Sequence, residues 1–251
     1  MSCRIFTGNL VIPKPGSQMR LTGDESKYVA RVLRLREGDS LILSSADGVE
    51  CVSTISAVEK KSVLLTIDSV EKPERESKLH ITLCQSLPKS KKMDLIVQKC
   101  TELGVSRFVP FLSSRSVSRP DRRESAEKKG RWEKIALEAA RQCGRTFIPP
   151  VDGIADFDEL IESFSNSDDK KTLKLIPWEC EDEKGLKELA GEEVERVVLL
   201  IGPEGGFSDE EVEKARKNGF IPLSLGPRLL RTETAGFSTV SIVQYIWGDM
   251  N

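Results

Sequence analysis

The sequence is poor in the residue types that build metal sites, disulfide frameworks and catalytic triads. Among its 251 residues are six cysteines, placed far apart without a Cys-x-x-Cys pair, and a single histidine, His80. This spacing provides neither a zinc template nor a disulfide framework, so we expect free thiols in a reducing compartment and no metal site. A Ser-His-Asp triad would depend on His80 alone and is therefore disfavoured.

Long apolar runs and abundant aromatic residues are also missing. The longest apolar run, VVLLI at 197–201, is far shorter than the roughly 18–20 residues that a membrane-spanning helix needs. The first residues, MSCRIFTG, lack the basic-then-apolar pattern of a secretory signal. We therefore expect a cytoplasmic protein without a membrane partner. Aromatic residues are only 6% of the chain, which disfavours broad base-stacking surfaces.

The formal net charge of −2 conceals an uneven distribution of charged residues. Residues 85–145 contain 15 Lys and Arg against 7 Asp and Glu, whereas residues 146–196 contain 6 against 15. The basic segment can form a site for a polyanion such as RNA, or the two segments can be solvated faces that attract each other. Charge alone leaves both interpretations open.

Residues 1–72 have the pattern of a small, mostly β domain. SLILSSADG, VECVSTISAVE and SVLLTIDSVE are short segments rich in β-branched residues and separated by turn residues. ESKYVARVLRLREGD has apolar residues at helical spacing and predicts a helix that ends near Gly38. Arg31 and Arg34 on this helix either lie on a solvated face or contact RNA. The charged segment EKPERESK at 71–78 is interpreted as a linker.

Residues 73–251 alternate between strand-like and helix-like segments. Solidly apolar strands that alternate with helices predict an α/β domain whose parallel sheet is covered on both faces. The last predicted helix, about 233–248, has almost no polar face. Such a helix is typical of an element buried on several sides or at a dimer interface.

Three predicted strands end in Pro or Gly-Pro: LKLIPWE, VVLLIGPEGGF and IPLSLGPRLLR. A single Gly-Pro is usually only a turn, but ligands of open parallel sheets bind beyond the carboxyl ends of the strands. Three such ends predict one pocket of turn backbone and apolar side chains. GPEGGF contains no Lys or Arg, and the next helix begins with the acidic capping sequence SDEE, so a phosphate is disfavoured there. S-adenosylmethionine, which has an adenosine and a cationic centre but no phosphate, fits this pattern.

Two C-terminal segments resemble the signature loops of a known family. They are LIGPEGGFSDEEV at 200–212 and LGPRLLRTETAGFS at 225–238. Both are similar to the loops of the ribosomal small-subunit RNA methyltransferases of the SPOUT superfamily, which make N3-methyluridine in 16S rRNA. The segments 87–105, 115–145 and 28–39 resemble the basic segments and the N-terminal domain of this family, so the resemblance extends along nearly the whole chain. The sequence departs from the family pattern at Tyr28, where a histidine is usual, and at Pro227 and Gly236.

The resemblance implies the fold and the assembly of the protein. It implies a PUA-like β-barrel at residues 1–72 that contributes to RNA binding. It also implies a SPOUT methyltransferase domain at residues 73–251 with a parallel sheet and a deep trefoil knot. Members act as homodimers and hold S-adenosylmethionine in the knot loops. The implied partner is 16S rRNA, free or in the assembled small subunit.

Strand ends and resemblance together select candidate binding residues. The predicted cofactor-binding residues are Pro177, Leu200, Ile201, Gly202, Pro203, Leu225, Gly226, Leu230, Thr232, Thr234 and Ala235. The predicted RNA-binding residues are Arg31, Arg34, Lys89, Lys92, Arg115, Arg119 and Arg131.

The candidate catalytic residues are Arg228, Arg231 and Glu233. Methylation at N3 of uracil requires loss of a proton and spreads negative charge onto O2 and O4. Arg231 or Arg228 would donate hydrogen bonds to this developing oxyanion. Glu233 would accept the proton or orient an arginine, or would only stabilise the helix dipole. The alternatives to this function are a SPOUT methyltransferase for another RNA position and an RNA-binding ribosome-assembly factor with a vestigial pocket.

Overall fold

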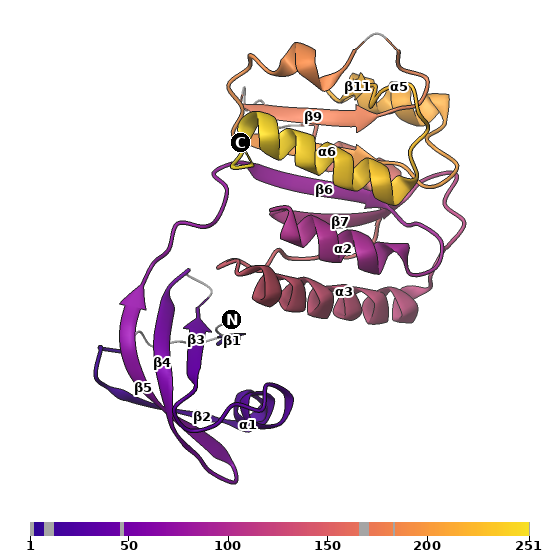
Figure 1. The fold of residues 1–251 in the computed structure, drawn as a ribbon. Coiled ribbons are helices and arrows are strands. Elements are labelled where there is room, and N and C mark those ends of the chain that lie inside the picture. Colours follow the sequence, from indigo (N-terminus) through magenta and orange to yellow (C-terminus); the bar gives the residue numbers. More distant parts are fainter. Residues whose placement is uncertain (1–2, 8–12, 46–47, 166–170, 183, 251) are drawn as a thin grey trace. The chain divides into compact units, whose positions relative to one another are not determined.

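The computed structural model describes residues 3–7, 13–45, 48–165, 171–182 and 184–250. The chain divides into two compact units (Figure 1). Unit 1 comprises residues 1–76 and 140–148, and unit 2 comprises residues 77–139 and 149–251. The domain boundary between residues 72 and 73 stays a prediction, and the return of 140–148 to unit 1 was not expected.

Unit 1 is built on a five-stranded sheet in the order β1-β3-β4-β5-β2. Its strands are β1 (Cys3–Phe6), β2 (Gln18–Thr22), β3 (Ser40–Ser44), β4 (Glu50–Val58) and β5 (Ser62–Glu71). β1 pairs parallel with β3, and the other neighbours are antiparallel. Alternate residues such as Leu41, Leu43 and Leu65 point into one hydrophobic core. The β-rich character predicted for this region is confirmed.

The helix of unit 1 is shorter than predicted. α1 (Gly23–Lys27) continues into a π-helical turn, η1 (Tyr28–Val32), whose C-terminal cap is Leu33. Arg34 adopts a left-handed conformation with φ of 55°, which stops the helix. The carboxylate of Asp39 then accepts a hydrogen bond of 2.6 Å from the backbone N–H of Arg36 and closes a turn. The prediction that the helix extends to Gly38 is therefore wrong, because apolar spacing does not reveal the backbone reversal at Arg34.

Glu76 attaches the returning segment 140–148 to the rest of unit 1. Its carboxylate accepts hydrogen bonds from the Arg145 guanidinium at 2.7 and 2.9 Å. It also accepts bonds from the backbone N–H groups of Thr146 at 2.8 Å and of Phe147 at 3.1 Å. The first residue of the segment 71–78, which we interpreted as a linker, is also the last residue of β5. Glu76, near the other end of this segment, forms the contact with residues 145–147.

We expect Glu76→Ala to destabilise unit 1 by about 2 kcal/mol, because the mostly buried Arg145 guanidinium and two backbone donors lose their acceptor. Differential scanning calorimetry should show a lower Tm for this variant. Glu74→Ala is the matched control: Glu74 is exposed and lies two positions away in the same segment. Equal Tm values for the two variants would contradict the structural role of Glu76.

Unit 2 contains a six-stranded sheet in the order β11-β9-β10-β6-β7-β8. Its strands are β6 (His80–Ser86), β7 (Arg107–Leu112), β8 (Ala155–Asp156), β9 (Thr172–Pro177), β10 (Arg196–Ile201) and β11 (Ile221–Leu223). All neighbouring strands pair parallel, as predicted. β9 lies between β11 and β10, so the carboxyl ends of these three strands are adjacent.

Helices cover both faces of this sheet, which confirms the second part of the prediction (Figure 1). One face carries α2 (Lys92–Glu102), α3 (Arg122–Cys143) and α6 (Thr232–Trp247). The other carries α4 (Phe157–Ser163) and α5 (Asp209–Lys217), and a short helix, η2 (Leu186–Leu189), precedes β10. Both sides of β10 are buried: Val197 and Leu199 belong to the first core, and Val198 and Leu200 to the second.

α6 does not bury its whole apolar surface within the chain. Ile242 and Tyr245 are exposed to 39% and 64%, although Thr239 and Gln244 on the same helix are fully buried. The homodimer and the trefoil knot stay predictions of the resemblance. No helix among the described residues combines the length and the apolar character needed to cross a bilayer.

Candidate functional site

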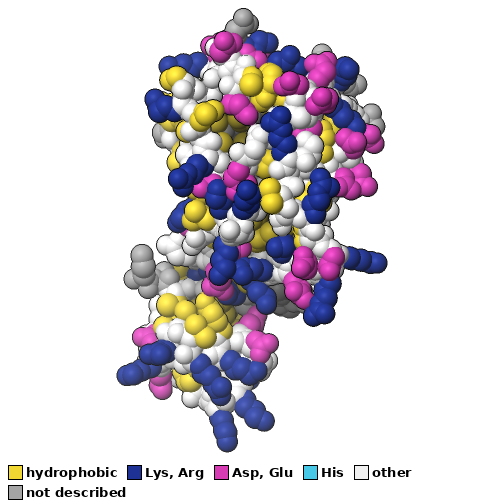
Figure 2. Space-filling view, turned by 90° about the vertical axis from the view of Figure 1, so that its right-hand side faces the viewer, with side chains coloured by type: hydrophobic (Ala, Val, Ile, Leu, Met, Phe, Trp, Pro, Cys, Tyr) yellow, Lys and Arg dark blue, Asp and Glu magenta, His cyan; other side chains and the backbone are white. Residues whose placement is uncertain are grey.

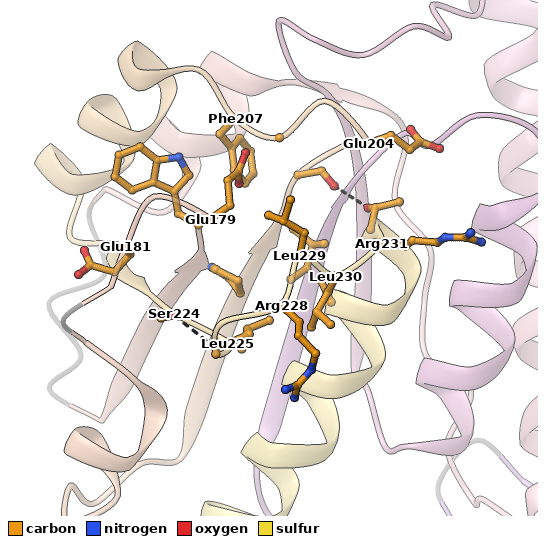
Figure 3. A pocket seen from close by; sticks show the side chains of 18 of the residues that line it. Glu179, Glu181, Glu204, Phe207, Ser224, Leu225, Arg228, Leu229, Leu230 and Arg231 are labelled. Carbon is orange, nitrogen blue, oxygen red and sulfur yellow. Dashed lines mark hydrogen bonds between the residues drawn. The ribbon is translucent and has the colours of Figure 1, made fainter.

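The loops that follow β9, β10 and β11 surround a cavity of about 820 Å³ at the carboxyl edge of the unit 2 sheet (Figure 3). A volume of this size is typical of small-molecule sites. The three strand ends meet as expected, because parallel neighbours deliver their carboxyl ends to the same edge of a sheet. The beginning of α6 completes the wall.

Most of the predicted cofactor-binding residues line this cavity: Pro177, Ile201, Gly202, Pro203, Leu225, Gly226, Leu230, Thr232 and Ala235. Two do not. Leu200 is fully buried in the core on the α4 and α5 side, because successive residues of a strand point to opposite faces. Thr234 is exposed on α6 and lies outside the lining. The cofactor-binding roles of all these residues stay predictions.

Arg228 and Arg231 both line the cavity, whereas Glu233 does not. Figure 3 shows the two arginine side chains extending in different directions from the loop before α6. Arg231 is the N-cap residue of α6 and has an extended backbone. Leu229, between the two arginines, is 86% exposed. The backbone of Arg231 is therefore fixed by the helix, whereas Arg228 lies in the more open part of the loop.

The cavity also has an acidic side, which was not predicted from the sequence. Glu179, Glu181 and Asp182 follow β9 directly and line the cavity together with Trp178. Glu181 also forms an ion pair of 3.5 Å with Arg216. Three carboxylates on one wall suit a ligand with a positive charge. The signal was present in the sequence, since WECED follows the apolar run that ends at Pro177.

Hydrogen bonds connect the start of α6 to β6 and to the loop after β10. The Thr232 hydroxyl donates to the carbonyl of Gly202 at 2.5 Å and accepts from the side-chain amide of Gln85 at 2.9 Å. Gln85 is fully buried at the end of β6. These contacts fix the loop after β10 to the first turn of α6.

The acidic beginning of α5 forms the predicted capping box and also supports the site. Ser208 accepts from the Glu211 backbone N–H at 3.3 Å, and the Glu211 carboxylate accepts from the Ser208 backbone N–H at 2.9 Å. The same carboxylate accepts from the backbone N–H of Ser114 at 2.7 Å. Arg115 adds a bond of 2.8 Å to the carbonyl of Gly205. The loop after β7 is thereby attached to the loop after β10.

Glycines leave the backbone of the cavity wall open. Gly226 has a φ of +99°, a conformation that residues with a Cβ rarely adopt, and nothing lies within 4 Å of the position its Cβ would take. At Gly202 a Cβ would come within 3.1 Å of the Phe207 ring. Gly226 thus permits the left-handed turn after β11, and Gly202 permits the close packing of the Phe207 ring.

Lys92, which we expected to contact RNA, instead joins two carboxylates next to the cavity. Its ammonium lies 3.1 Å from Glu204 and 3.2 Å from Glu233. Burial would lower the pKa of Lys92, but the hydrogen bonds and charges of both glutamates outweigh burial and raise it. Burial likewise opposes ionisation of Glu204, but hydrogen bonds from backbone N–H groups and from Lys92 lower its pKa.

The other predicted RNA-binding residues differ in their surroundings. Arg31, Arg34, Lys89 and Arg119 are exposed. Arg115 bonds to Gly205, and Arg131 forms an ion pair with Asp94. In Figure 2, Lys and Arg side chains project from the visible face of unit 1 with some Asp and Glu among them, and charges of both signs are also mixed over unit 2. Among the described residues, no group of three or more His, Cys, Asp and Glu side chains could hold a metal ion.

Comparison with protein families identifies the class to which this fold and cavity belong. A family of RNA methyltransferase domains matches residues 75–244, and a family of RNA methyltransferase PUA domains matches residues 21–68. The protein thus combines a PUA-like domain with an α/β domain of the SPOUT methyltransferase type.

Individual relatives are more specific. The chain is 32% identical to ribosomal RNA small subunit methyltransferase E of Bacillus subtilis, over 90% of this chain and 89% of the relative. It is 33% identical to the protein of that name from Buchnera aphidicola, over 93% of this chain and 90% of the relative. The chain belongs to the ribosomal RNA small subunit methyltransferase E family, which confirms the resemblance found in the sequence.

Two solved structures share the fold along almost the whole chain. A methyltransferase from Legionella pneumophila, crystallised with S-adenosylmethionine, is 36% identical with a TM-score of 0.86, and 99% of each chain is covered. Ribosomal RNA small subunit methyltransferase E of Neisseria gonorrhoeae, bound to S-adenosylmethionine, is 29% identical with a TM-score of 0.88, and 100% of each chain is covered.

Proposed function

We propose that this protein transfers a methyl group from S-adenosylmethionine to N3 of a specific uridine in 16S rRNA. The observation that carries the proposal is the single cavity formed by the loops after β9, β10 and β11. Two relatives with the same fold were crystallised with S-adenosylmethionine. The uridine and its N3 position come from the resemblance of the two signature loops.

The residues present fit this cofactor. Glu179 and Asp182 on the cavity wall complement a cationic sulfonium and ammonium group, whereas the charge of Glu181 is paired with Arg216. The backbone of the loops after β10 and β11 lines the cavity at Gly202 and Gly226, and Leu225 and Leu230 provide apolar contact for an adenine ring. The loop from Gly202 to Phe207 contains no Lys or Arg that would bind a phosphate. We therefore expect the adenosine to lie against the backbone of the loops after β10 and β11.

Bound S-adenosylmethionine supplies an electrophilic methyl group; the chain must orient the uracil and stabilise its charge. N3 must give up its proton, for which water is the acceptor when Glu233 stays paired with Lys92, and negative charge then develops on O2 and O4. The guanidinium groups of Arg231 and Arg228 line the cavity and can donate hydrogen bonds to these oxygens. Because the helix fixes the backbone of Arg231, we assign the larger contribution to this residue.

The contacts of Glu233 favour a positioning role over that of a proton acceptor. Its carboxylate is only 13% exposed, pairs with Lys92 and does not line the cavity. To act as a base it would have to leave Lys92 and reach the uracil. Glu233 therefore serves the reaction by holding the first turn of α6, the helix that begins directly after Arg231.

RNA binding should depend on exposed basic residues and on salt. We expect the double variant Lys89→Ala/Arg119→Ala to bind small-subunit RNA more weakly and to lower the slope of log K against log salt by about 1 to 2, since each phosphate contact contributes roughly 0.7–0.9. Fluorescence titrations at several salt concentrations measure this slope. The control is Lys187→Ala/Lys217→Ala, two exposed lysines elsewhere in unit 2. If the two double variants had the same slope, these residues would not contact phosphates.

The function itself is tested by methylation of small ribosomal subunits from a strain that lacks this gene. We expect incorporation of one methyl group and a mass shift that maps to the base of one uridine as N3-methyluridine. A modification at another RNA position would assign the protein to a different SPOUT reaction. Failure to bind S-adenosylmethionine in calorimetry would indicate an assembly factor with a vestigial pocket.

A further inference from the structure

Lys92 occupies a position that is electrostatically unfavourable for a helix by itself. It is the first residue of α2 and follows Lys89 and Lys91, so positive charges gather at the positive end of the helix dipole. The preceding Ser90 has a φ of 58°, a left-handed conformation that is strained for residues with a Cβ. The positive charges at the helix N-terminus and the strained backbone at Ser90 both destabilise this turn, so contacts outside α2 must compensate for them.

The compensation comes from the cofactor loop and from α6. Lys92 Nζ lies 3.1 Å from Glu204 in the loop after β10 and 3.2 Å from Glu233 in the first turn of α6. The turn at Ser90 also directs the backbone N–H of Lys89 to Glu204 at 3.0 Å. Glu204 thus accepts two hydrogen-bonding contacts from one turn, and Lys92 bridges two segments that are far apart in the sequence.

All three side chains are withdrawn from solvent: those of Lys92, Glu204 and Glu233 are 31%, 26% and 13% exposed. The contacts between Lys92 and its carboxylates raise the pKa of Lys92 and lower the pKa of Glu204, so both shifts favour the charged forms in spite of burial. An ammonium shared between two carboxylates has little capacity left for an RNA phosphate. Loss of Lys92 would leave two carboxylates close together without a counter-charge, and the like charges would separate the loop from the helix.

We propose that Lys92 is a positioning residue that locks the loop after β10 to the first turn of α6 and thereby fixes Arg231 at the cavity. Glu204 lies in the wall of the cavity, and Glu233 lies two positions after Arg231 (Figure 3). The bond between Thr232 and the carbonyl of Gly202 joins the same two segments on the buried side. Lys92 is the more exposed of the two connections. The expected effect of Lys92 on catalysis rests on the proposed function, whereas its expected effect on the order of the loop after β10 does not.

The kinetic test compares Lys92→Met, which keeps the length of the side chain and removes its charge, with Lys92→Arg. We expect Lys92→Met to lower kcat at least tenfold while KM for the small subunit changes less than twofold, and Lys92→Arg to stay within threefold of the unchanged protein. Lys99→Met is the matched control, because Lys99 lies on the same helix and pairs with Glu102 away from the cavity. A phosphate contact predicts the opposite pattern for Lys92→Met: a raised KM, a smaller salt slope and an unchanged kcat, which would overturn the proposal.

Glu204→Gln provides the coupling test. In the presence of Lys92 this change should lower kcat severalfold, whereas in the Lys92→Met background it should cause no further loss or a partial recovery, because it removes one of two uncompensated carboxylates. If Glu204→Gln lowered kcat by the same factor in the unchanged protein and in the Lys92→Met background, the two residues would act independently, and the assignment would be overturned. If Lys92→Met does not fold, Lys92→Gln provides a second background without the charge for the same comparison.

Hydrogen exchange measures whether Lys92 keeps the loop after β10 ordered, and it requires no assumption about activity. The amide of Gly206 donates to the carbonyl of Pro203 at 3.0 Å, so its protection reports on the order of the loop after β10. We expect exchange in residues 202–208 to become at least fivefold faster in Lys92→Met and to stay unchanged in Lys99→Met. Unchanged exchange in both would overturn the lock. A protein that shows the expected exchange but methylates no RNA would overturn the proposed function and leave the lock in place.

Discussion

Arg231→Ala is expected to lower kcat for methyl transfer by about 10²–10³, while the affinity for S-adenosylmethionine changes less than threefold. Removal of one pre-organised donor to a developing oxyanion typically has an effect of this size. Arg231 meets the requirement for pre-organisation: it lines the cavity, is the N-cap residue of α6, and precedes Thr232, whose hydroxyl bonds to the loop after β10. Single-turnover kinetics with saturating cofactor, combined with calorimetry, separate the two quantities.

Two comparisons make this prediction specific. Arg228→Ala should have a smaller effect on kcat, because Arg228 lies beside the exposed Leu229 and its backbone is not fixed by a helix. Arg196→Ala is the control for loss of an exposed arginine, since Arg196 begins β10 at the opposite edge of the same sheet. If Arg231→Ala weakened cofactor binding and left kcat intact, Arg231 would be a cofactor ligand and its catalytic assignment would be wrong.

Gly226→Val is expected to weaken binding of S-adenosylmethionine by about tenfold to a hundredfold. Gly226 has a φ of +99°, and holding a β-branched residue there costs of the order of 1–3 kcal/mol. Steric crowding is not the reason, because nothing lies within 4 Å of the position of a Cβ. The loop after β11 would relax to a negative φ and move Leu225 and Leu230, which line the same cavity. Calorimetry measures the affinity.

Gly191→Val is the matched control for this loop. Gly191 also has open space at its Cβ position, but it has no positive φ and does not line the cavity. We expect this variant to bind S-adenosylmethionine like the unchanged protein. Equal affinities for the two variants would show that the conformation of the loop after β11 does not determine binding.

Lys89 and Lys92 share one charge and one prediction but have different surroundings in the structure. Both belong to the same basic turn, and the sequence predicts RNA contact for each. The Lys89 side chain is exposed, in agreement with such a contact, whereas Lys92 faces Glu204 and Glu233. The two glutamates lie more than a hundred residues further along the chain, so no local pattern identifies them as partners.

The sequence by itself determined the parallel α/β domain, the β-rich N-terminal region, the family, and the meeting of three strand ends in one pocket. The family came from the resemblance of the two C-terminal loops; the other features depend on local information, namely the spacing of apolar residues, Gly and Pro at strand ends, and the capping sequence at Ser208. Such signals act within a few residues, and the rule that ligands lie beyond the carboxyl ends of parallel strands extends them to the location of the site.

Only the tertiary structure decided which side chains meet there. The neighbourhood of β9, β10 and β11 brings the acidic residues after Pro177 to the cavity, and the packing of α2 beside α6 places Lys92 between Glu204 and Glu233. The return of residues 140–148 to Glu76 is of the same kind. In each case the partners are far apart in the sequence. Their contact follows from the order in which strands and helices are arranged around the core. The spacing of apolar residues and the positions of turn residues do not specify this order.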